Sequence, residues 1–280
     1  MTLTGTWSQA LDAIQDRGVL VEESGHGWSE PVRAVPLDGI LRADVVLVLV
    51  KSTQTLRTAP LVAGSIADDG VAVTLQNGLG NAEALASVVD ATRIVAGVTT
   101  AGATLLAPGH VRGFPAPCVL GRDRAGRAQS IADLLTAAGF PTAVEDDIDG
   151  PVWRKLAVNC AINPLSALRG VPNGLLLDTP DDRALLEAAA SEVQAVATAR
   201  GTRVIGDYRE AALEAARVTA GNRSSMLQDV ERQAPTEIEA MNGAVVREGG
   251  RLGVPTPTLS SLLDQIRARE AVYRAAGTTA

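Results

Sequence analysis

The stretch that most constrains the fold is Asp44–Val50, which reads D-V-V-L-V-L-V. After its first residue it is continuously apolar and mostly β-branched, as expected of a strand covered on both faces of a parallel sheet. Further strand-like segments, among them Val71–Leu75 and Ile94–Thr99, alternate with helical patterns up to about residue 145. This alternation predicts a parallel sheet with helices on its faces.

The second half of the chain has a different pattern. The run Glu145–Pro151 combines charge, glycine and proline, which mark a boundary between structured segments. Beyond it, Arg183–Arg200, Arg209–Ala220 and Leu259–Ala276 all have helical patterns. We therefore predict an α/β domain over residues 1–146 and an all-α domain over residues 147–280.

The segment Trp153–Leu168 indicates one helix with a polar face. Lys155, Asn159 and Asn163 fall at positions i, i+4 and i+8, so one cation and two amides line the same side. The residues around them are apolar, which indicates a largely buried helix, and buried polar groups need partners. A solvated stripe on an amphipathic helix is the alternative interpretation. The apolar surroundings favour a functional site.

Pro164 stands within this predicted helix. Proline has no N–H, so the carbonyl of Cys160 loses its helical partner. We therefore expect the helix to kink or stop at Pro164.

A later helix has a possible start signal at Thr236. Thr236 and Glu239 have the spacing of a capping box, in which the threonine caps the helix and the glutamate reaches back to the threonine N–H. Ile238, Met241 and Val245 would form the apolar stripe of this helix.

Composition excludes several classes of protein. Among the 280 residues, 46% are hydrophobic and the net charge is −7, which argues against binding to a phosphate backbone. The two cysteines and two histidines have no metal-ligand spacing, so we expect reduced thiols and no metal site. No apolar run has the length of a membrane span and no signal pattern opens the chain. We predict a cytoplasmic protein that binds neither nucleic acid nor membrane.

Polar residues follow two of the predicted strands. Lys51-Ser52-Thr53-Gln54 comes after the first strand, and Gln76-Asn77-Gly78-Leu79-Gly80 after the next. The carboxyl ends of such strands are where α/β folds place ligands, and glycine permits close backbone approach. A solvated lysine and an ordinary turn are the alternative interpretations.

These segments together resemble the ketopantoate reductase (2-dehydropantoate 2-reductase) family. The matching motifs occur in the family's order and span nearly the whole chain. They are V-K-S-T-Q at Val50–Gln54, Q-N-G at Gln76–Gly78, W-R-K-L-A-V-N-C-A-I-N-P-L at Trp153–Leu165, S-S-M-L-Q-D at Ser224–Asp229, and T-E-I-E-A-M-N-G at Thr236–Gly243.

The resemblance implies an oxidoreductase of pantothenate biosynthesis that reduces 2-dehydropantoate, or a related 2-keto acid, with NADPH. It implies that Lys155 is the catalytic general acid, and that Asn159 and Asn163 are amides that bind the substrate. Ser225 would hold the substrate carboxylate and Glu237 its hydroxyl. A helix cap at Ser225 and a first-turn helix charge at Glu237 are the competing structural interpretations.

The resemblance also implies the residues around the cofactor. Asn77 would lie near both nicotinamide and substrate, and Lys51 and Gln54 would belong to the turn that binds the cofactor. The chemistry agrees with the residue types, because a positioned ammonium can stabilise and then protonate the oxygen of a ketone that receives a hydride.

The sequence departs from the family at its beginning. The family opens with a strand, a G-x-G-x-x-G loop and a helix, whereas this sequence resembles the family from the second strand, Thr2–Gly5, onward. Thr6 or Trp7 stands where the family tends to place an arginine for the 2′-phosphate of NADPH. Without the loop, a dinucleotide loses its main anion site. We therefore predict an incomplete Rossmann-like sheet whose two strands beside the gap have unpaired edges.

Three explanations of this departure stay open: the chain starts late, another chain supplies the piece, or redox function is lost. The last would leave a non-redox enzyme that enolises, cyclises or decarboxylates a keto acid through Lys155. A non-catalytic binding module is a further alternative. Because unpaired edges favour association, we expect a homodimer as well as a small keto acid as partners.

Overall fold

A computed structural model describes residues 1–23, 25–37 and 42–277 of the chain. The chain divides into two compact units. The sheet unit comprises Met1–Leu49, Leu56–Leu75 and Ala84–Asp146. The helical unit comprises Asp147–Ala280 together with two segments from the first half, Val50–Thr55 and Gln76–Glu83. Each added segment follows a strand of the sheet unit. The polar residues predicted at the strand ends, Lys51–Gln54 and Gln76–Gly80, therefore make most of their contacts with the helical unit.

The sheet unit contains a five-stranded sheet in the order β11-β10-β7-β6-β5. The neighbours β5, β6 and β7 run parallel, β10 runs antiparallel to β7, and β11 runs parallel to β10. These strands confirm the predicted parallel sheet, with one antiparallel exchange. Their bounds are β5 (Ala43–Val48), β6 (Ile66–Thr74), β7 (Ile94–Thr99), β10 (Cys118–Gly121) and β11 (Thr142–Glu145).

All the helices of the first half except α1 follow strands of this sheet in the described chain. α4 packs on β10 and β11, and its buried residues Ala128, Ile131 and Ala132 join a core with valines of β6 and β7. The helices are α1 (Ser8–Arg17), α2 (Thr55–Ser65), α3 (Asn81–Ala86) and α4 (Arg127–Ala137), with short 3₁₀ turns η1 (Ser52–Gln54) and η2 (Ala91–Arg93).

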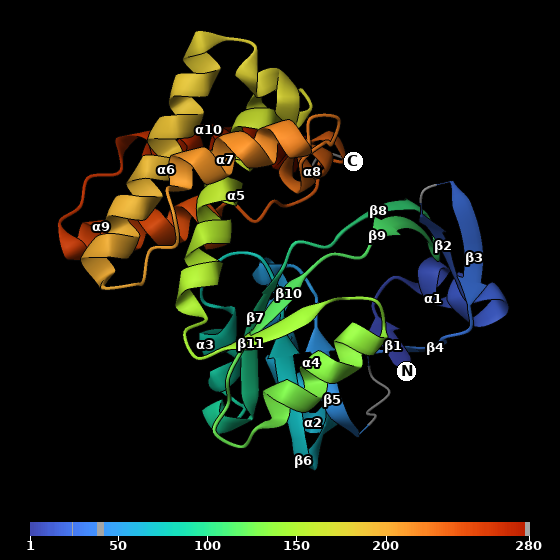
Figure 1. Ribbon diagram of the computed structural model, residues 1–280. Coiled ribbons are helices and arrows are strands. Elements are labelled where there is room, and N and C mark those ends of the chain that lie inside the picture. Colours follow the sequence, from blue (N-terminus) through green and yellow to red (C-terminus); the bar gives the residue numbers. More distant parts are fainter. Residues whose placement is uncertain (24, 38–41, 278–280) are drawn as a thin grey trace. The chain divides into compact units, whose positions relative to one another are not determined.

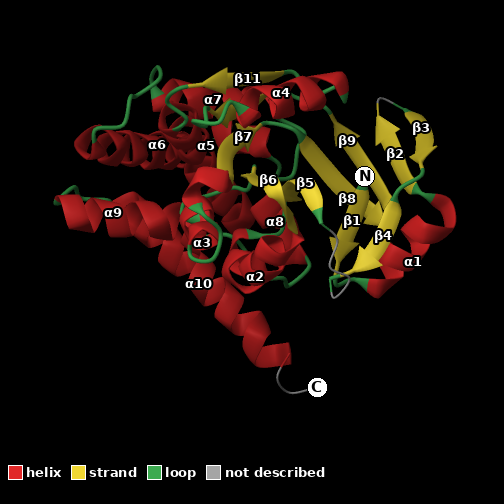
Figure 2. Ribbon diagram, turned by 90° about the horizontal axis from the view of Figure 1, so that it is seen from below, coloured by secondary structure: helices red, strands yellow, loops and turns green. Residues whose placement is uncertain are grey.

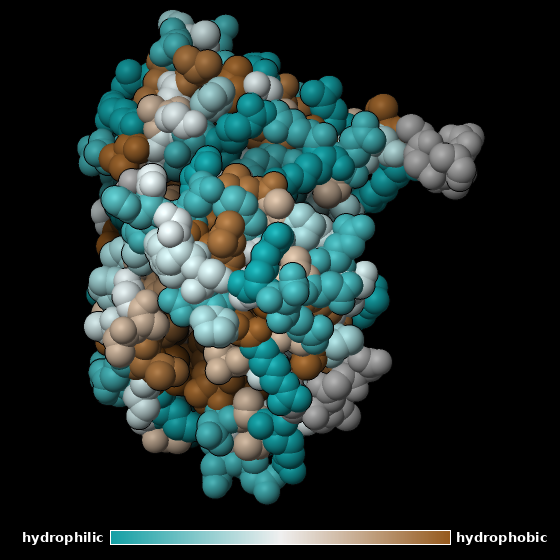
Figure 3. Space-filling model, turned by 90° about the vertical axis from the view of Figure 1, so that its right-hand side faces the viewer, coloured by the Kyte–Doolittle hydropathy of each residue, from teal (hydrophilic) through white to brown (hydrophobic). Residues whose placement is uncertain are grey.

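The prediction that Asp44–Val50 is covered on both faces was wrong. In β5 the side chain of Leu47 is 41% exposed, and Leu49 just beyond the strand is 63% exposed. The reason is position, because β5 is the last strand of its sheet in the described part of the chain. Figure 3 shows apolar atoms, in brown, among hydrophilic ones on one face of the molecule.

A separate two-stranded parallel sheet pairs β1 (Thr2–Gly5) with β4 (Arg33–Pro36). Figure 1 shows α1 beside these strands, which it contacts through a small cluster of Leu11, Ile14 and Ala34. The β1–β4 pair is not joined to β5 by hydrogen bonds among the described residues. This division agrees with the predicted unpaired edges on either side of a gap in the sheet.

The sequence did not predict the four-stranded sheet in the order β3-β2-β9-β8. Its strands are β2 (Val19–Glu23), β3 (His26–Glu30), β8 (Gly102–Ala107) and β9 (His110–Phe114). Most of their residues are exposed or half-buried, so the apolar alternation that marks a strand is weak. The β8–β9 turn contains Gly109, whose φ of 70° is a conformation that favours glycine.

The helical unit is built around α5. This helix contacts α6, α7, α8 and α10, and its residues Trp153, Leu156 and Leu165 are at most 2% exposed. Figures 1 and 2 show α5 and α6 side by side. The elements are α5 (Asp149–Arg169), η3 (Asn173–Leu177), α6 (Pro180–Arg200), α7 (Tyr208–Val218), α8 (Ser225–Glu231), η4 (Glu239–Gly243, a π-helical turn), α9 (Ala244–Leu252) and α10 (Pro257–Gly277).

The prediction of an all-α second half is therefore confirmed, and α5 contains the whole predicted helix. In the described part of the chain, no helix is long and apolar enough to cross a membrane.

Candidate functional site

The predicted polar residues of α5 belong to a helix that continues through Pro164. α5 runs past Pro164 to Arg169, so of the two expected outcomes, a kink or a stop, the stop does not occur. The carbonyl of Cys160, which Pro164 deprives of its helical donor, accepts a hydrogen bond of 3.2 Å from Asn242 Nδ2. Asn242 is fully buried, and its hydrogen bond replaces the one that the proline cannot make. Cys160 is also fully buried, and burial raises the pKa of its thiol, as expected of a core residue.

Three of the predicted site residues form one chain of hydrogen bonds within the helical unit. Lys155 Nζ donates to Asn77 Oδ1 at 2.8 Å, and Asn77 Nδ2 donates to Glu237 Oε2 at 3.3 Å. The ammonium can only donate and the carboxylate can only accept, so the two charges fix the orientation of the amide between them. This polar chain links a cation and an anion through a neutral group.

Glu237 also receives a backbone donor from the first strand-end segment. Its Oε1 accepts from the N–H of Ser52, in η1, at 2.8 Å. Hydrogen bonds to an ionised carboxylate are stronger than those between neutral groups. Ser52 therefore fixes Oε1 of Glu237, while Asn77 holds Oε2. The sequence did not indicate Ser52, because a main-chain donor has no side-chain signature.

Lys51 is engaged by a buried carboxylate. Its Nζ lies 2.5 Å from Asp229 Oδ1 and donates to the carbonyl of Pro235 at 3.0 Å. Asp229 is 9% exposed, and burial raises the pKa of its carboxyl while the nearby Lys51 lowers it. Asp229 belongs to the S-S-M-L-Q-D motif, which was the available signal. The cofactor role predicted for Lys51 remains a prediction.

The two strand-end segments are tied to each other. Gln76 Nε2 donates to the carbonyl of Val50 at 2.6 Å and to Thr55 Oγ1 at 2.8 Å. Thr55 Oγ1 donates to Asn81 Oδ1 at 2.8 Å, and Asn81 Nδ2 donates to the carbonyl of Asn77 at 2.9 Å. This network fixes the main chain on both sides of Asn77 and so orients its amide. Gln54, at the exposed end of η1, stays a predicted cofactor residue.

Gly78 is needed for contact with η4. Its φ is 82°, and a Cβ on it would lie 2.5 Å from the carbonyl oxygen of Ala240. The next residue, Leu79, donates its N–H to that carbonyl at 2.8 Å. The close backbone approach predicted for this turn is thus made to another part of the helical unit.

The remaining predicted residues lie on α5 and α8. Asn159 is half-buried one turn after Lys155, whereas Asn163 is 7% exposed. Ser225 is exposed as the first residue of α8. The helix cap is its neighbour Ser224, whose Oγ accepts from the N–H of Leu227 at 3.1 Å. The capping interpretation therefore applies to Ser224, and Ser225 stays a candidate for ligand binding.

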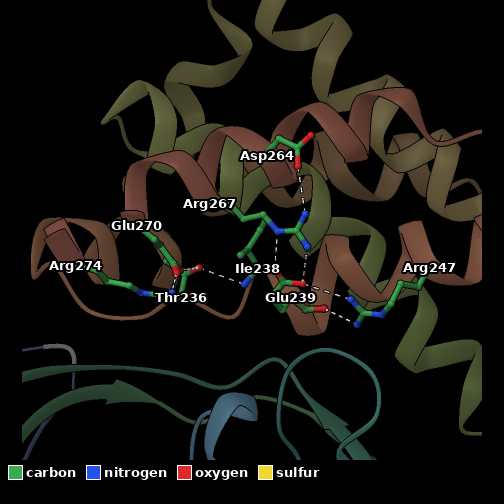
Figure 4. A network of polar contacts seen from close by, with 8 residues as sticks. All are labelled: Thr236, Ile238, Glu239, Arg247, Asp264, Arg267, Glu270 and Arg274. Carbon is green, nitrogen blue, oxygen red and sulfur yellow. Dashed lines mark hydrogen bonds and ion pairs between the residues drawn. The ribbon is translucent and has the colours of Figure 1, made fainter. Parts of the chain in front are cut away.

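The predicted capping box at Thr236 was wrong. Figure 4 shows that Glu239 turns to Arg247 and Arg267 instead of reaching back to Thr236. The N–H of Thr236 donates to Glu270 Oε1 of α10 at 2.9 Å. Thr236 does cap in part, because its Oγ1 accepts from the N–H of Ile238 at 3.3 Å. A partner 34 residues away thus displaces the local one.

A parallel-sheet unit of Rossmann type followed by a helical unit, with a lysine–amide–carboxylate chain in the latter, defines a class of two-domain oxidoreductases. The pattern of the family "Ketopantoate reductase PanE/ApbA" matches residues 1–122, and that of "Ketopantoate reductase PanE/ApbA C terminal" matches residues 147–270. The chain belongs to the ketopantoate reductase family.

Individual relatives agree with this family. The 2-dehydropantoate 2-reductase of Halobacterium salinarum is 36% identical, over 95% of this chain and 90% of the relative. The crystal structure of a PanE/ApbA family ketopantoate reductase from Ralstonia eutropha has a TM-score of 0.88 at 31% identity, covering 95% of this chain and 89% of that one. D-mandelate dehydrogenase in a ternary structure with NADH has a TM-score of 0.90 at 24% identity, covering 97% and 91%, which supports the fold alone.

Proposed function

We propose that this chain reduces 2-dehydropantoate, or a related branched 2-keto acid, to the 2-hydroxy acid with NADPH. The observation that carries the proposal is the Lys155–Asn77–Glu237 chain of hydrogen bonds at positions of the family's motifs. A cation, a neutral amide and an anion within one site are suited to a substrate that has both a ketone and a hydroxyl group.

Lys155 is the general acid of the proposed reaction. The nicotinamide, when bound, supplies a hydride to the ketone carbon. The ammonium of Lys155 stabilises the negative charge that develops on the ketone oxygen and then donates a proton to it. Ketone, hydride and proton together give the 2-hydroxy acid. Asn77 holds the ammonium through its Oδ1 and thereby limits the positions that the proton donor can take.

The other polar residues bind the substrate in this proposal. Glu237 accepts a hydrogen bond from the substrate hydroxyl, and Ser225 donates to its carboxylate. Asn159 and Asn163 contribute amide groups from α5. Support for these roles comes from their positions in the family's motifs and from the placement of Asn159 and Asn163 on the same helix as Lys155.

The fit of the dinucleotide is good at one end only. The parallel strands β5 and β6 carry Lys51, Gln54 and Asn77 just beyond their carboxyl ends, where this fold class binds cofactors. No stretch of the printed sequence reads G-x-G-x-x-G, and the cation of Lys51 is already paired with Asp229. Asn77 and Gln54 are therefore suited to the nicotinamide end of the cofactor. We propose that residues 1–280 do not contain the glycine-rich loop with which the family binds the cofactor phosphates.

Calorimetry tests this proposal. NADPH is titrated into the 280-residue chain with and without ketopantoate, and we expect binding in the micromolar range that is followed by NADPH oxidation. A folded protein that binds ketopantoate but not NADPH would contradict the reductase and favour a non-redox reaction of the keto acid. A folded protein that binds neither molecule would contradict both.

We further propose a cytoplasmic homodimer. In the described part of the chain β5 pairs on one side only, and this edge together with the exposed Leu47 and Leu49 supports association, because exposed strand edges favour pairing with another chain. Light scattering should give the mass of two chains. A single monomeric species over the micromolar range would contradict this proposal.

A further inference from the structure

The C-terminal helix contacts the main chain next to Glu237 through a buried carboxylate. Glu270 of α10 is 6% exposed, and its Oε1 accepts from the N–H of Thr236 at 2.9 Å and from Thr236 Oγ1 at 2.6 Å. Its other oxygen pairs with Arg274, one turn further along α10. Figure 4 shows Thr236, Glu270 and Arg274 joined in this way. Thr236 is 3% exposed and immediately precedes Glu237.

A second contact from α10 fixes the same stretch of chain. Tyr273 Oη donates to the carbonyl of Ala234 at 2.9 Å. Positions 234 and 236 are thus both bound to one face of α10, which leaves the backbone little freedom just before Glu237. Glu237 then reaches Ser52 and Asn77 with its two carboxylate oxygens.

We propose that Glu270 is a positioning residue for Glu237. By holding both donors of Thr236, it directs the carboxylate of Glu237 onto the N–H of Ser52 and the amide of Asn77. A buried carboxylate is costly unless its oxygens are bonded, and here both oxygens of Glu270 are bonded. The kinetic part of this inference rests on the proposed function, whereas the structural part does not.

Glu192 provides a matched control. Its Oε1 and Oε2 accept from the N–H groups of Thr258 and Leu259, at 2.8 Å each, at the start of α10. Like Glu270, it is a glutamate that satisfies two donors at a chain segment of the helical unit. Unlike Glu270, it does not contact Thr236, so Glu192→Ala removes comparable stabilisation without releasing Glu237.

Amide hydrogen exchange of the full chain tests the structural part, with the N–H of Ser52 as reporter of the Glu237 carboxylate. In Glu270→Ala we expect Ser52 to exchange roughly tenfold faster than in Glu192→Ala, since the hydrogen bond from the N–H of Ser52 to the Glu237 carboxylate is weakened only in the former. Glu270→Gln, which keeps an acceptor for Thr236, should restore most of the protection. Equal exchange of Ser52 in Glu270→Ala and Glu192→Ala would overturn the inference.

A double-mutant cycle tests the kinetic part. We expect Glu270→Ala to lower kcat/KM for ketopantoate roughly tenfold in the wild-type background, chiefly through KM, because a misplaced binding group is costly. In a Glu237→Ala background the same change should have less than about a twofold effect, since Glu270 acts through Glu237. Equal effects in both backgrounds would overturn the inference. An inactive wild type would refute the proposed function alone, because the exchange of Ser52 still decides the position of Glu237.

Discussion

The two units bury their residues to different degrees. In the helical unit, α5 lies within a continuous core in which Trp153, Leu165 and Leu186 are at most 1% exposed. In the sheet unit, the strands are divided between separate sheets, and β5 leaves Leu47 41% exposed. The residues of the polar chain all have their contacts within the better packed unit. Precise placement of the side chains of a candidate site needs a well-packed support, and the core of the helical unit is suited to that role.

The largest effect is expected at the residue that α5 presents to the polar chain. Lys155→Ala should lower kcat roughly 1,000-fold, within the range that loss of a general acid costs. Arg154→Ala is the matched control, because it removes an exposed cation from the same helix. Steady-state kinetics with ketopantoate measures both. Comparable losses in the two variants would mean that the chemistry does not depend on the polar chain.

Asn77→Asp should have the next largest effect. It replaces the neutral link between Lys155 and Glu237 with a second carboxylate, 3.3 Å from Glu237 Oε2 in the present geometry. Two adjacent carboxylates repel, and the donor to Glu237 is lost, so we expect kcat/KM to fall roughly 100-fold. Asn222→Asp makes the same chemical change at an exposed position and should leave kcat/KM within about twofold. A similar fall in both variants would indicate a general effect of charge.

The residues of this chain show how far sequence reasoning reaches. Helical periodicity placed Lys155, Asn159 and Asn163 on one face of α5, and the resemblance identified Asn77 and Glu237 before any contact was visible. Local patterns did not reveal the partners that come from distant segments.

Three residues show why those partners were missed. Ser52 and Glu270 contact their partners across 185 and 34 residues, and Glu270 also displaced the capping box. Asp229 forms an ion pair with Lys51, and only the folded chain brings these two residues together. The exposure of β5 depends on how many strands pair with it, and the amino-acid composition of β5 alone does not reveal that number.

Core substitutions test whether the two units are stabilised separately. Leu186→Ala in the helical unit and Leu120→Ala in the sheet unit each remove a side chain that is 0% exposed, at a cost of about 2–5 kcal/mol. Since the two leucines belong to separate cores, each variant should speed hydrogen exchange mainly in its own unit. Equal acceleration in both units would contradict the division into two cores.

The smallest effect is expected at the start of α7. Asp207 caps this helix by accepting from the N–H of Arg209 at 2.8 Å, and its bond with the Arg209 side chain lowers the pKa of its carboxyl to about 2. Asp207→Ala should lower the free energy of unfolding by about 1 kcal/mol at pH 7.

The same carboxyl gives a pH dependence of known sign. The pKa of Asp207 is depressed in the folded chain. Its contribution to the free energy of unfolding is therefore fully present above pH 3.8, the ordinary pKa of an aspartate, and is lost as the pH falls through about 2. Urea unfolding at several pH values measures the difference between the variants. Asp207→Asn keeps a capping oxygen and should cost less than Asp207→Ala, and equal losses would argue against the cap.

The central claim is that this protein reduces a 2-keto acid with NADPH, and that Lys155 of the polar chain donates the proton. Its most direct test is to mix the wild-type chain with NADPH and ketopantoate and to follow NADPH absorbance and pantoate formation together. The account predicts one NADPH oxidised for each pantoate formed. Conversion of ketopantoate without NADPH oxidation, or no conversion by a folded chain that has bound both molecules, would contradict it.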